Sequence, residues 1–169
     1  MHQGSHRDHE GAKKLFSLIK DVKVAMMTTV DSDGQLRSRP MWNQEADEAG
    51  DLWFFAKVDA PVTGEISRDS QVNLAYSDPS NQNYVSVSGK AEIVRDKATI
   101  DSKWNESLKT WFPKGKDDPS VTLIRVHPEK GEYWDSPNAT MLHLYGYVKA
   151  AVTGESPKTE KKAVDLAAH

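Results

Sequence analysis

The chain has 169 residues, the length of a single domain, and its 22 basic and 25 acidic residues give a net charge of −3. That balance argues against a dedicated nucleic-acid-binding protein, which usually carries a basic excess, and no apolar run is long enough to span a membrane. The chain has no cysteine, which excludes disulfides, thiolate catalysis and Cys-ligated metals, and without an apolar signal segment we expect it in the cytoplasm.

The first part of the chain predicts a helix followed by a hairpin. Residues 1–10 are polar and rich in histidine, and we expect a flexible leader there. Residues 10–20 predict an amphipathic helix, because their apolar side chains recur at helical spacing. Residues 24–30 and 36–43 are apolar and β-rich, and the Asp-Gly turn at residues 31–34 joins them as a hairpin.

The middle of the chain alternates short strands with one short helix. Residues 52–56 predict a strongly apolar strand. Residues 62–68 predict a helix, because Pro61 before them suits a first helical turn. Two further strands are predicted over residues 72–77 and 84–94, and the longer one shows the alternation of apolar and polar residues typical of a half-buried strand.

In the last third, Asp96 is a candidate N-cap for a helix carrying Ile100, Trp104 and Leu108 at helical spacing. Further strands are predicted over residues 121–126, 132–134 and 141–152. Strands follow strands with too few helices for regular βαβ winding, which favours a mostly β fold. We expect an antiparallel split β-barrel of six to eight strands with peripheral helices over residues 11–152, followed by a polar tail, 153–169.

The most unusual segment comprises Arg37, Ser38, Arg39, Pro40, Met41 and Trp42. On a strand Arg37 and Arg39 point the same way, and two guanidinium groups on one face favour an anion such as phosphate. Pro40 has no N–H for a sheet ladder, so it marks an edge or a bulge beside which a ligand could lie. An ordinary solvent-facing strand with two arginines is the alternative.

A second candidate site follows in the next strand. Trp53, Phe54 and Phe55 could form a flat apolar wall for a ring system, or could simply pack in the core. Lys57, just after them, could meet a phosphate or only be solvated. The sequence contains neither a P-loop nor a Gly-x-Gly-x-x-Gly dinucleotide fingerprint, and we expect no metal site.

Several segments also form a specific series in chain order across residues 12–152. They are residues 25–31, 34–41, 52–55, 72–79, 84–91, Trp104, 111–113, 117–119 and 132–135. In this series the chain resembles the general stress protein branch of the pyridoxamine 5′-phosphate oxidase-like, FMN-binding split-barrel superfamily. The resemblance implies a homodimer with FMN, rather than FAD, in the clefts between the subunits.

The resemblance also implies which residues hold the flavin. Arg37 would be the leading phosphate ligand with Arg39 as its helper, and the late residues Tyr84 and Trp134 would approach the cofactor. The implied cofactor-binding set is Arg37, Ser38, Arg39, Pro40, Met41, Trp42, Phe54, Phe55, Ala56, Lys57, Tyr84 and Trp134.

One departure from the family pattern concerns the phosphate site. Relatives usually carry a lysine where this chain has Val62, and Pro61 precedes it. The expected phosphate site therefore lacks a cation, and Lys57 and Arg68 are the candidates to compensate for it.

The implied function is that of an FMN-binding general stress protein and flavin-dependent oxidoreductase with an unidentified substrate. The alternatives are a flavin carrier without turnover, or a flavin-free dimeric interaction module. True pyridoxamine-phosphate oxidase activity is not expected. Residues 135–144 contain no arginine, and their histidine, His143, is displaced by one residue from the position expected in the oxidases, which turns a strand side chain to the opposite face.

Overall fold

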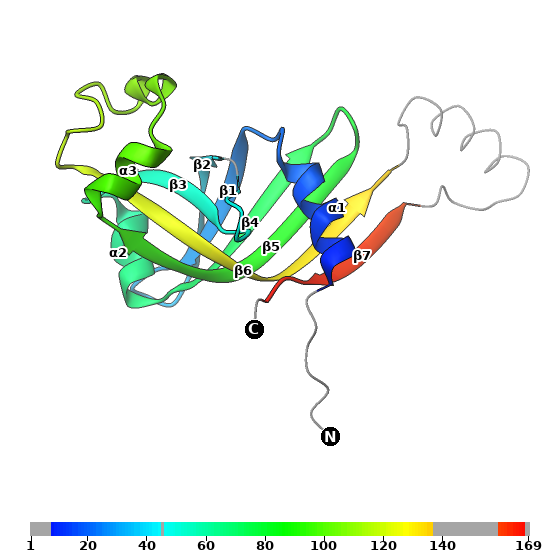
Figure 1. Ribbon diagram of the computed structural model, residues 1–169. Coiled ribbons are helices and arrows are strands. Elements are labelled where there is room, and N and C mark those ends of the chain that lie inside the picture. Colours follow the sequence, from blue (N-terminus) through cyan, green and yellow to red (C-terminus); the bar gives the residue numbers. More distant parts are fainter. Residues whose placement is uncertain (1–7, 45, 137–158, 168–169) are drawn as a thin grey trace, which may run out of the picture.

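The computed structural model describes residues 8–44, 46–136 and 159–167, which form one curved antiparallel sheet with helices at its ends (Figure 1). The strands are Val24–Val30 (β1), Leu36–Trp42 (β2), Leu52–Lys57 (β3), Gln71–Asp78 (β4), Asn83–Val94 (β5), Val121–Asp135 (β6) and Glu160–Asp165 (β7). The helices are His9–Ile19 (α1), Pro61–Arg68 (α2), Lys97–Lys103 (α3) and the 3-10 helix Glu106–Thr110 (η1). No helix among the described residues is long and apolar enough to cross a bilayer.

The sheet is split between β2 and β3. The strand order is β2-β1-β4-β5-β6-β3, with β7 paired to β6, so β2 and β3 end the series. These two strands share no ladder, although just beyond β2 the N–H of Gln44 donates to the carbonyl of Trp53 over 3.3 Å. The predicted antiparallel split barrel is therefore confirmed, and its seam lies between the second and third strands.

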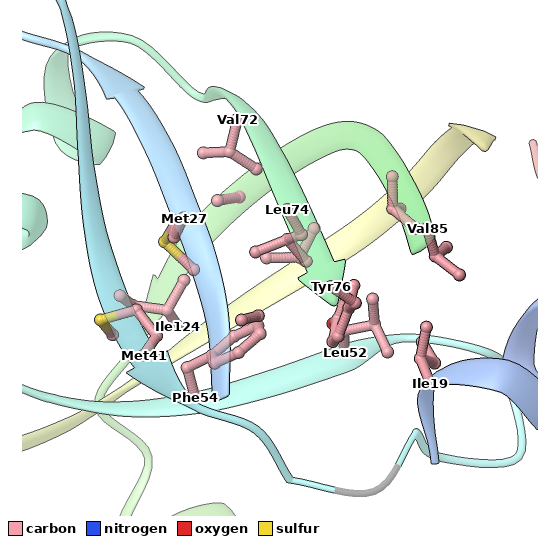
Figure 2. Packing of buried hydrophobic residues seen from close by; sticks show 14 of the residues in the cluster. Ile19, Met27, Met41, Leu52, Phe54, Val72, Leu74, Tyr76, Val85 and Ile124 are labelled. Atoms are coloured by element: carbon pink, nitrogen blue, oxygen red, sulfur yellow. The ribbon is translucent and has the colours of Figure 1, made fainter. Parts of the chain in front are cut away.

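The barrel interior is filled by alternate side chains of its strands. Figure 2 shows Met27, Met41, Phe54, Leu74 and Ile124, from five different strands, pointing into one core. β3 is buried on both faces, because its other side packs against α3 and η1 in a second cluster. That cluster contains Trp53, Phe55, Ile100, Leu108, Phe112, Val121 and Leu123. The double burial explains why β3 is a continuous apolar run instead of an alternating one.

Two local predictions are confirmed, the second with a correction. Gly34 has φ 78° in the turn that joins β1 to β2, a conformation that favours glycine. The Asp96 side chain caps α3 by accepting from the N–H of Thr99 at 2.9 Å. The predicted helix does not continue, however, because Trp104 has extended backbone and Leu108 belongs to η1.

β6 differs most from the sequence prediction. The two predicted strands, 121–126 and 132–134, are parts of one strand of 15 residues. Pro128 lies inside it, where the register shifts between Ser88 and Gly89 on β5. A Cβ at Gly89 would lie 2.1 Å from the His127 carbonyl oxygen, so only glycine allows the chains to approach this closely. The shift thus accommodates a proline that cannot donate to the ladder.

The two ends of the chain also depart from the predicted leader and tail. α1 begins at His9, inside the predicted leader, and β7 lies inside the predicted polar tail. β7 pairs with β6, and its Val164, with Leu166 beyond it, is buried in the core against α1. Most residues of this edge strand are polar and face outward, so the composition of the segment did not predict a strand. The predicted strand 141–152 lies outside the described residues.

Candidate functional site

An apolar pocket opens at the seam between β2 and β3. It encloses about 380 Å³ and is lined by Val24, Pro40, Met41, Trp42, Phe55, Lys57, Leu108, Trp111 and Phe112. The ring of Phe55 makes edge contacts with those of Trp104, at 5.7 Å, and Phe112, at 6.3 Å, which fixes this wall. Lys57 is the one ionisable side chain among these lining residues. We call this the seam pocket.

A buried carboxylate on α2 holds the two arginines of β2. Glu65 is 2% exposed, and its Oε1 accepts from Nη1 of Arg37 at 2.9 Å. Its Oε2 accepts from Nη2 of Arg39 at 2.6 Å and from Oγ1 of Thr29 at 2.6 Å. Nη1 of Arg39 also donates to Thr29 at 2.6 Å, which closes a ring of bonds. The arginines therefore share one strand face, as predicted, but both already have an anionic partner.

The same contacts set the ionisation of Glu65. Burial by itself would raise the pKa of this carboxyl. The hydrogen bond from Thr29 and the charges of Arg39 and Arg37 act in the opposite direction and hold the pKa of Glu65 below its usual range. Glu65 is thus a charged group at neutral pH and depends on its partners.

The two arginines differ in what else they can reach. The Arg37 side chain is 52% exposed, whereas that of Arg39 is 19% exposed. Arg37 lines a second pocket of about 510 Å³ at the start of α2, with Asp31, Ser32, Asp33, Val58, Asp59, Ala60, Pro61, Gly64, Glu65 and Arg68. We call this the α2 pocket. Arg37 can still donate to a ligand there, while Arg39 serves mainly to neutralise Glu65.

The lining of the α2 pocket indicates which cation lies near the position where relatives carry a lysine and this chain has Val62. Val62 is 5% exposed and packs in the core, so its side chain does not line the pocket. Arg68 does line it, whereas Lys57 lines the seam pocket. Of the two compensating cations suggested by the sequence, Arg68 is therefore the one beside Arg37.

A cation can be introduced at one α2 position and not at another. Val62→Lys would bury a charge, so we expect it to destabilise the fold by about 3 kcal/mol or more. Gly64→Lys should be tolerated, because an added Cβ meets nothing within 4 Å and a lysine favours helix over glycine. Urea denaturation of both variants tests this difference, and equal stability would contradict the placement of Val62.

The structure separates the other predicted cofactor residues into groups. Pro40, Met41, Trp42, Phe55 and Lys57 meet around the seam pocket.

The remaining strand residues face elsewhere. Phe54 is fully buried in the barrel core, and Ala56 is also in that core. Ser38 is exposed, and its Oγ lies 2.6 Å from Oγ1 of Thr28.

Tyr84 and Trp134 do not join the seam pocket of their own chain. They are register partners across β5 and β6, and β1 and β4 stand between β5 and β2. Trp134 lies eight residues beyond Val126, the last β6 residue paired with β3, a separation of about 26 Å along a strand. The two side chains therefore lie far from the seam pocket of their own chain.

The outer face of the β1–β2 hairpin is apolar and exposed. Val24 and Met26 are 42% and 41% exposed, and Trp42 is 39% exposed beside them. The hairpin register pairs Val24 with Trp42 and Met26 with Pro40, so the four side chains form one patch. We call it the hairpin patch.

The residues that the sequence did not identify are the anionic partners. Glu65 is one of them. Asp51 is another: it is 6% exposed, and its Oδ2 accepts a hydrogen bond from Nη2 of Arg125 at 2.6 Å. Asp51 also lies 2.8 Å from Nδ1 of His127, a histidine without a convincing partner in the sequence. Only the pairing of β3 with β6 brings these residues together. No group of metal-ligating side chains occurs among the described residues, and His143 lies outside them.

Comparison with known proteins is consistent with this architecture. The profile of the family described as pyridoxamine 5′-phosphate oxidase like matches residues 10–158. Protein bli-3 of Neurospora crassa is 30% identical over 162 residues, covering 90% of this chain and 77% of that protein.

Two solved structures extend the comparison. A protein assigned as general stress protein 26 from Jannaschia sp. CCS1 superposes with a TM-score of 0.78 at 25% identity, covering 92% of this chain and 98% of the other. The general stress FMN/FAD binding protein of Xanthomonas citri superposes with a TM-score of 0.66 at 28% identity, covering 77% and 92%.

Proposed function

Because the chain belongs to the general stress protein branch of the pyridoxamine 5′-phosphate oxidase-like family, we propose that it binds FMN and acts as a flavin-dependent oxidoreductase. The ring would occupy the seam pocket and the phosphate would meet Arg37 in the α2 pocket. The general stress FMN/FAD binding protein of Xanthomonas citri supports a flavin in general, and the resemblance to FMN-binding split-barrel proteins favours FMN in our proposal.

The observation that carries the proposal is the continuity of β2 between the two pockets. Pro40, Met41 and Trp42 line the seam pocket, and Arg37 lines the α2 pocket. Met41 lies four positions beyond Arg37 on the strand, which corresponds to about 13 Å. A ring joined to a phosphate by a five-carbon chain can follow the strand over such a distance. The edge left free at Pro40 gives the ligand its place along the strand.

The cofactor would supply the redox chemistry, and the chain would hold and shield it. Trp42 and Phe55 offer aromatic faces and keep water from the ring. Lys57 places a positive charge at the same pocket. Arg37 would neutralise the phosphate while remaining bonded to Glu65.

The basic test is spectroscopic. Purified protein, or protein mixed with FMN and freed of excess by gel filtration, should be yellow and should show a flavin absorption spectrum shifted from that of free FMN. Reduction of this flavin by NADH or NADPH, followed by transfer to an acceptor, would support an oxidoreductase. A protein that binds FMN but turns over no donor would instead be a flavin carrier, and a colourless one would be an interaction module.

We also propose that the flavin site lies between two copies of the chain. The hairpin patch flanks the seam pocket and shares Val24, Pro40 and Trp42 with it. Tyr84 and Trp134 lie far from the pocket of their own chain, so a second copy could supply them. Obligate homodimers commonly bury about 2,000 Å² or more, and an apolar sheet face is suited to such an interface.

A charge in the hairpin patch should therefore prevent dimer formation. We expect the wild type to have the mass of a dimer in light scattering, and Met26→Asp to have that of a monomer, because an unpaired carboxylate would be buried in the interface. Thr28→Asp places the same charge on the same face but outside the patch, and we expect it to weaken the dimer less than Met26→Asp does. A wild type that is monomeric at micromolar concentration would overturn the proposed interface.

We further propose that the protein is not a pyridoxamine-phosphate oxidase. This proposal rests on the absence of arginine from residues 135–144, most of which lie outside the described residues. FMN-loaded protein should form no pyridoxal 5′-phosphate from pyridoxamine 5′-phosphate. Turnover at a rate typical of the oxidases would contradict it.

A further inference from the structure

A third pocket lies directly beside the seam pocket and is polar. It encloses about 540 Å³ and is lined by Lys20, Val22, Lys23, Trp42, Asn43, Gln44, Ala46, Ser102, Lys103, Asn105 and Ser107. These residues come from the loop after α1, the segment after β2 and the end of α3. Trp42 lines both this pocket and the seam pocket, so the two spaces adjoin at this residue. We call it the lysine pocket.

Lysine is the one charged residue type among the described residues that line the lysine pocket. Three of its lining residues are lysines and none of those described is acidic, whereas the α2 pocket has four carboxylates beside its two arginines. Lys20 and Lys23 form no ion pair with a described residue, in contrast to Lys97 and Lys109. This concentration of charge is local, because the chain as a whole carries −3.

Lys103 is the more confined of the three cations. Its Nζ lies 4.8 Å from the centre of the Trp53 ring. Burial raises the pKa of the nearby Asp47, whereas hydrogen bonds and then the charge of Lys103 lower it, with a lowered pKa as the result. The positive charge of Lys103 is thus partly balanced. Lys20 and Lys23 are exposed.

Gln44 lines the pocket, but its amide nitrogen is closed to solvent. The Oε1 of Gln44 accepts from Nδ2 of Asn105 at 3.3 Å, while its Nε2 is buried and bonds to no described group. The donors that a ligand would meet among the described residues are therefore the lysine ammonium groups. Their charge favours a negatively charged oxygen ligand.

We propose that the lysine pocket binds the carboxylate or phosphate group of a second ligand, whose apolar part lies against Trp42 next to the flavin. The substrate class would then be small aromatic or otherwise apolar organic anions. Each lysine offers three donors without a fixed geometry, which suits carboxylates and phosphates equally. The inference rests on the proposed function only in its account of what the ligand is for, because anion binding itself needs no flavin.

The competing occupant is the phosphate of the flavin itself. If FMN lay with its phosphate in the lysine pocket, neutralising Lys20 and Lys23 would weaken FMN and leave riboflavin unaffected. That outcome would overturn the proposal, and it would also overturn the role assigned to Arg37.

The test uses phenyl phosphate and benzoate as probes, with benzyl alcohol as the neutral counterpart, in titrations followed by calorimetry on the full-length protein with and without FMN. The variant is Lys20→Gln combined with Lys23→Gln, two exposed side chains without a described partner. The control is Lys13→Gln combined with Lys90→Gln, which removes the same charge from exposed positions outside the pocket.

We expect both anions to bind the wild type and the control, with affinity at least about ten-fold weaker in the Lys20 and Lys23 variant, and benzyl alcohol to show no such difference. An equal loss of anion affinity in the two double variants would show a general effect of net charge and would overturn the proposal. Absence of anion binding to the wild type would also overturn it. Anion binding to protein that takes up no FMN would leave the pocket standing while the proposed function fails.

Discussion

Arg39→Ala should destabilise the protein by about 3 kcal/mol, because it leaves the buried carboxylate of Glu65 without its closest charged partner. For a chain of this size that loss corresponds to a fall in Tm of about 6–12 °C. Arg37→Ala should cost much less, since its side chain is half exposed and Arg39 remains. Thermal unfolding of the two variants separates them.

The dependence on pH provides a second readout for Arg39. The pKa of Glu65 is lowered in the folded state, so its contribution to stability is complete above the pKa of an unfolded glutamate and is lost as the pH falls through the folded value. Arg39→Ala should therefore show a shallower loss of stability in acid than the wild type. Combining Arg39→Ala with Glu65→Gln should recover part of the stability at neutral pH. An additive loss in the double variant would show that the pair is not the cause.

The second large effect is expected on ligand affinity. Arg37→Ala should weaken FMN by about ten-fold or more, which is what the loss of one charge-assisted hydrogen bond costs, and should leave riboflavin nearly unchanged. Riboflavin lacks the phosphate that Arg37 would meet in the α2 pocket. Gly64→Lys should have the opposite effect on FMN, because it adds a cation to the same pocket.

Fluorescence titration of both flavins against each variant measures this difference. Arg95→Ala is the matched control, since Arg95 is exposed and lines none of the three pockets. Parallel losses for FMN and riboflavin in Arg37→Ala would assign the phosphate to another site.

Local signals in the sequence were sufficient for most of the fold. The turn ending at Gly34 and the N-cap at Asp96 are each decided by residues within a few positions of one another, and both are confirmed. Alternation likewise identified β5. The helix after Asp96 was predicted too long. Leu108 is buried against β3 from a separate 3-10 helix, and its spacing from Ile100 and Trp104 also fits a longer α-helix, so periodicity alone cannot distinguish the two.

The candidate site was only partly accessible from the sequence. Strand alternation predicts that Arg37 and Arg39 share a face, but nothing in their spacing indicates Glu65, which lies 26 residues beyond Arg39 in the chain. The side chain of Val62 points into the core for a similarly non-local reason, since the rotation of α2 is set by packing on the barrel. The lysine pocket combines three segments separated by up to about 80 residues, so no local pattern reveals it.

The split in the barrel has a consequence for its motions. β6 is bonded to β3, β5 and β7, whereas β2 is bonded to β1 alone, so β2 can move outward without breaking a ladder on its free side. Such local opening draws on the least stable part of a fold. Widening at this edge would admit a planar ligand, and closing would enclose it between Trp42 and Phe55. The strand that would contact the ligand is thus one that the sheet holds by a single ladder.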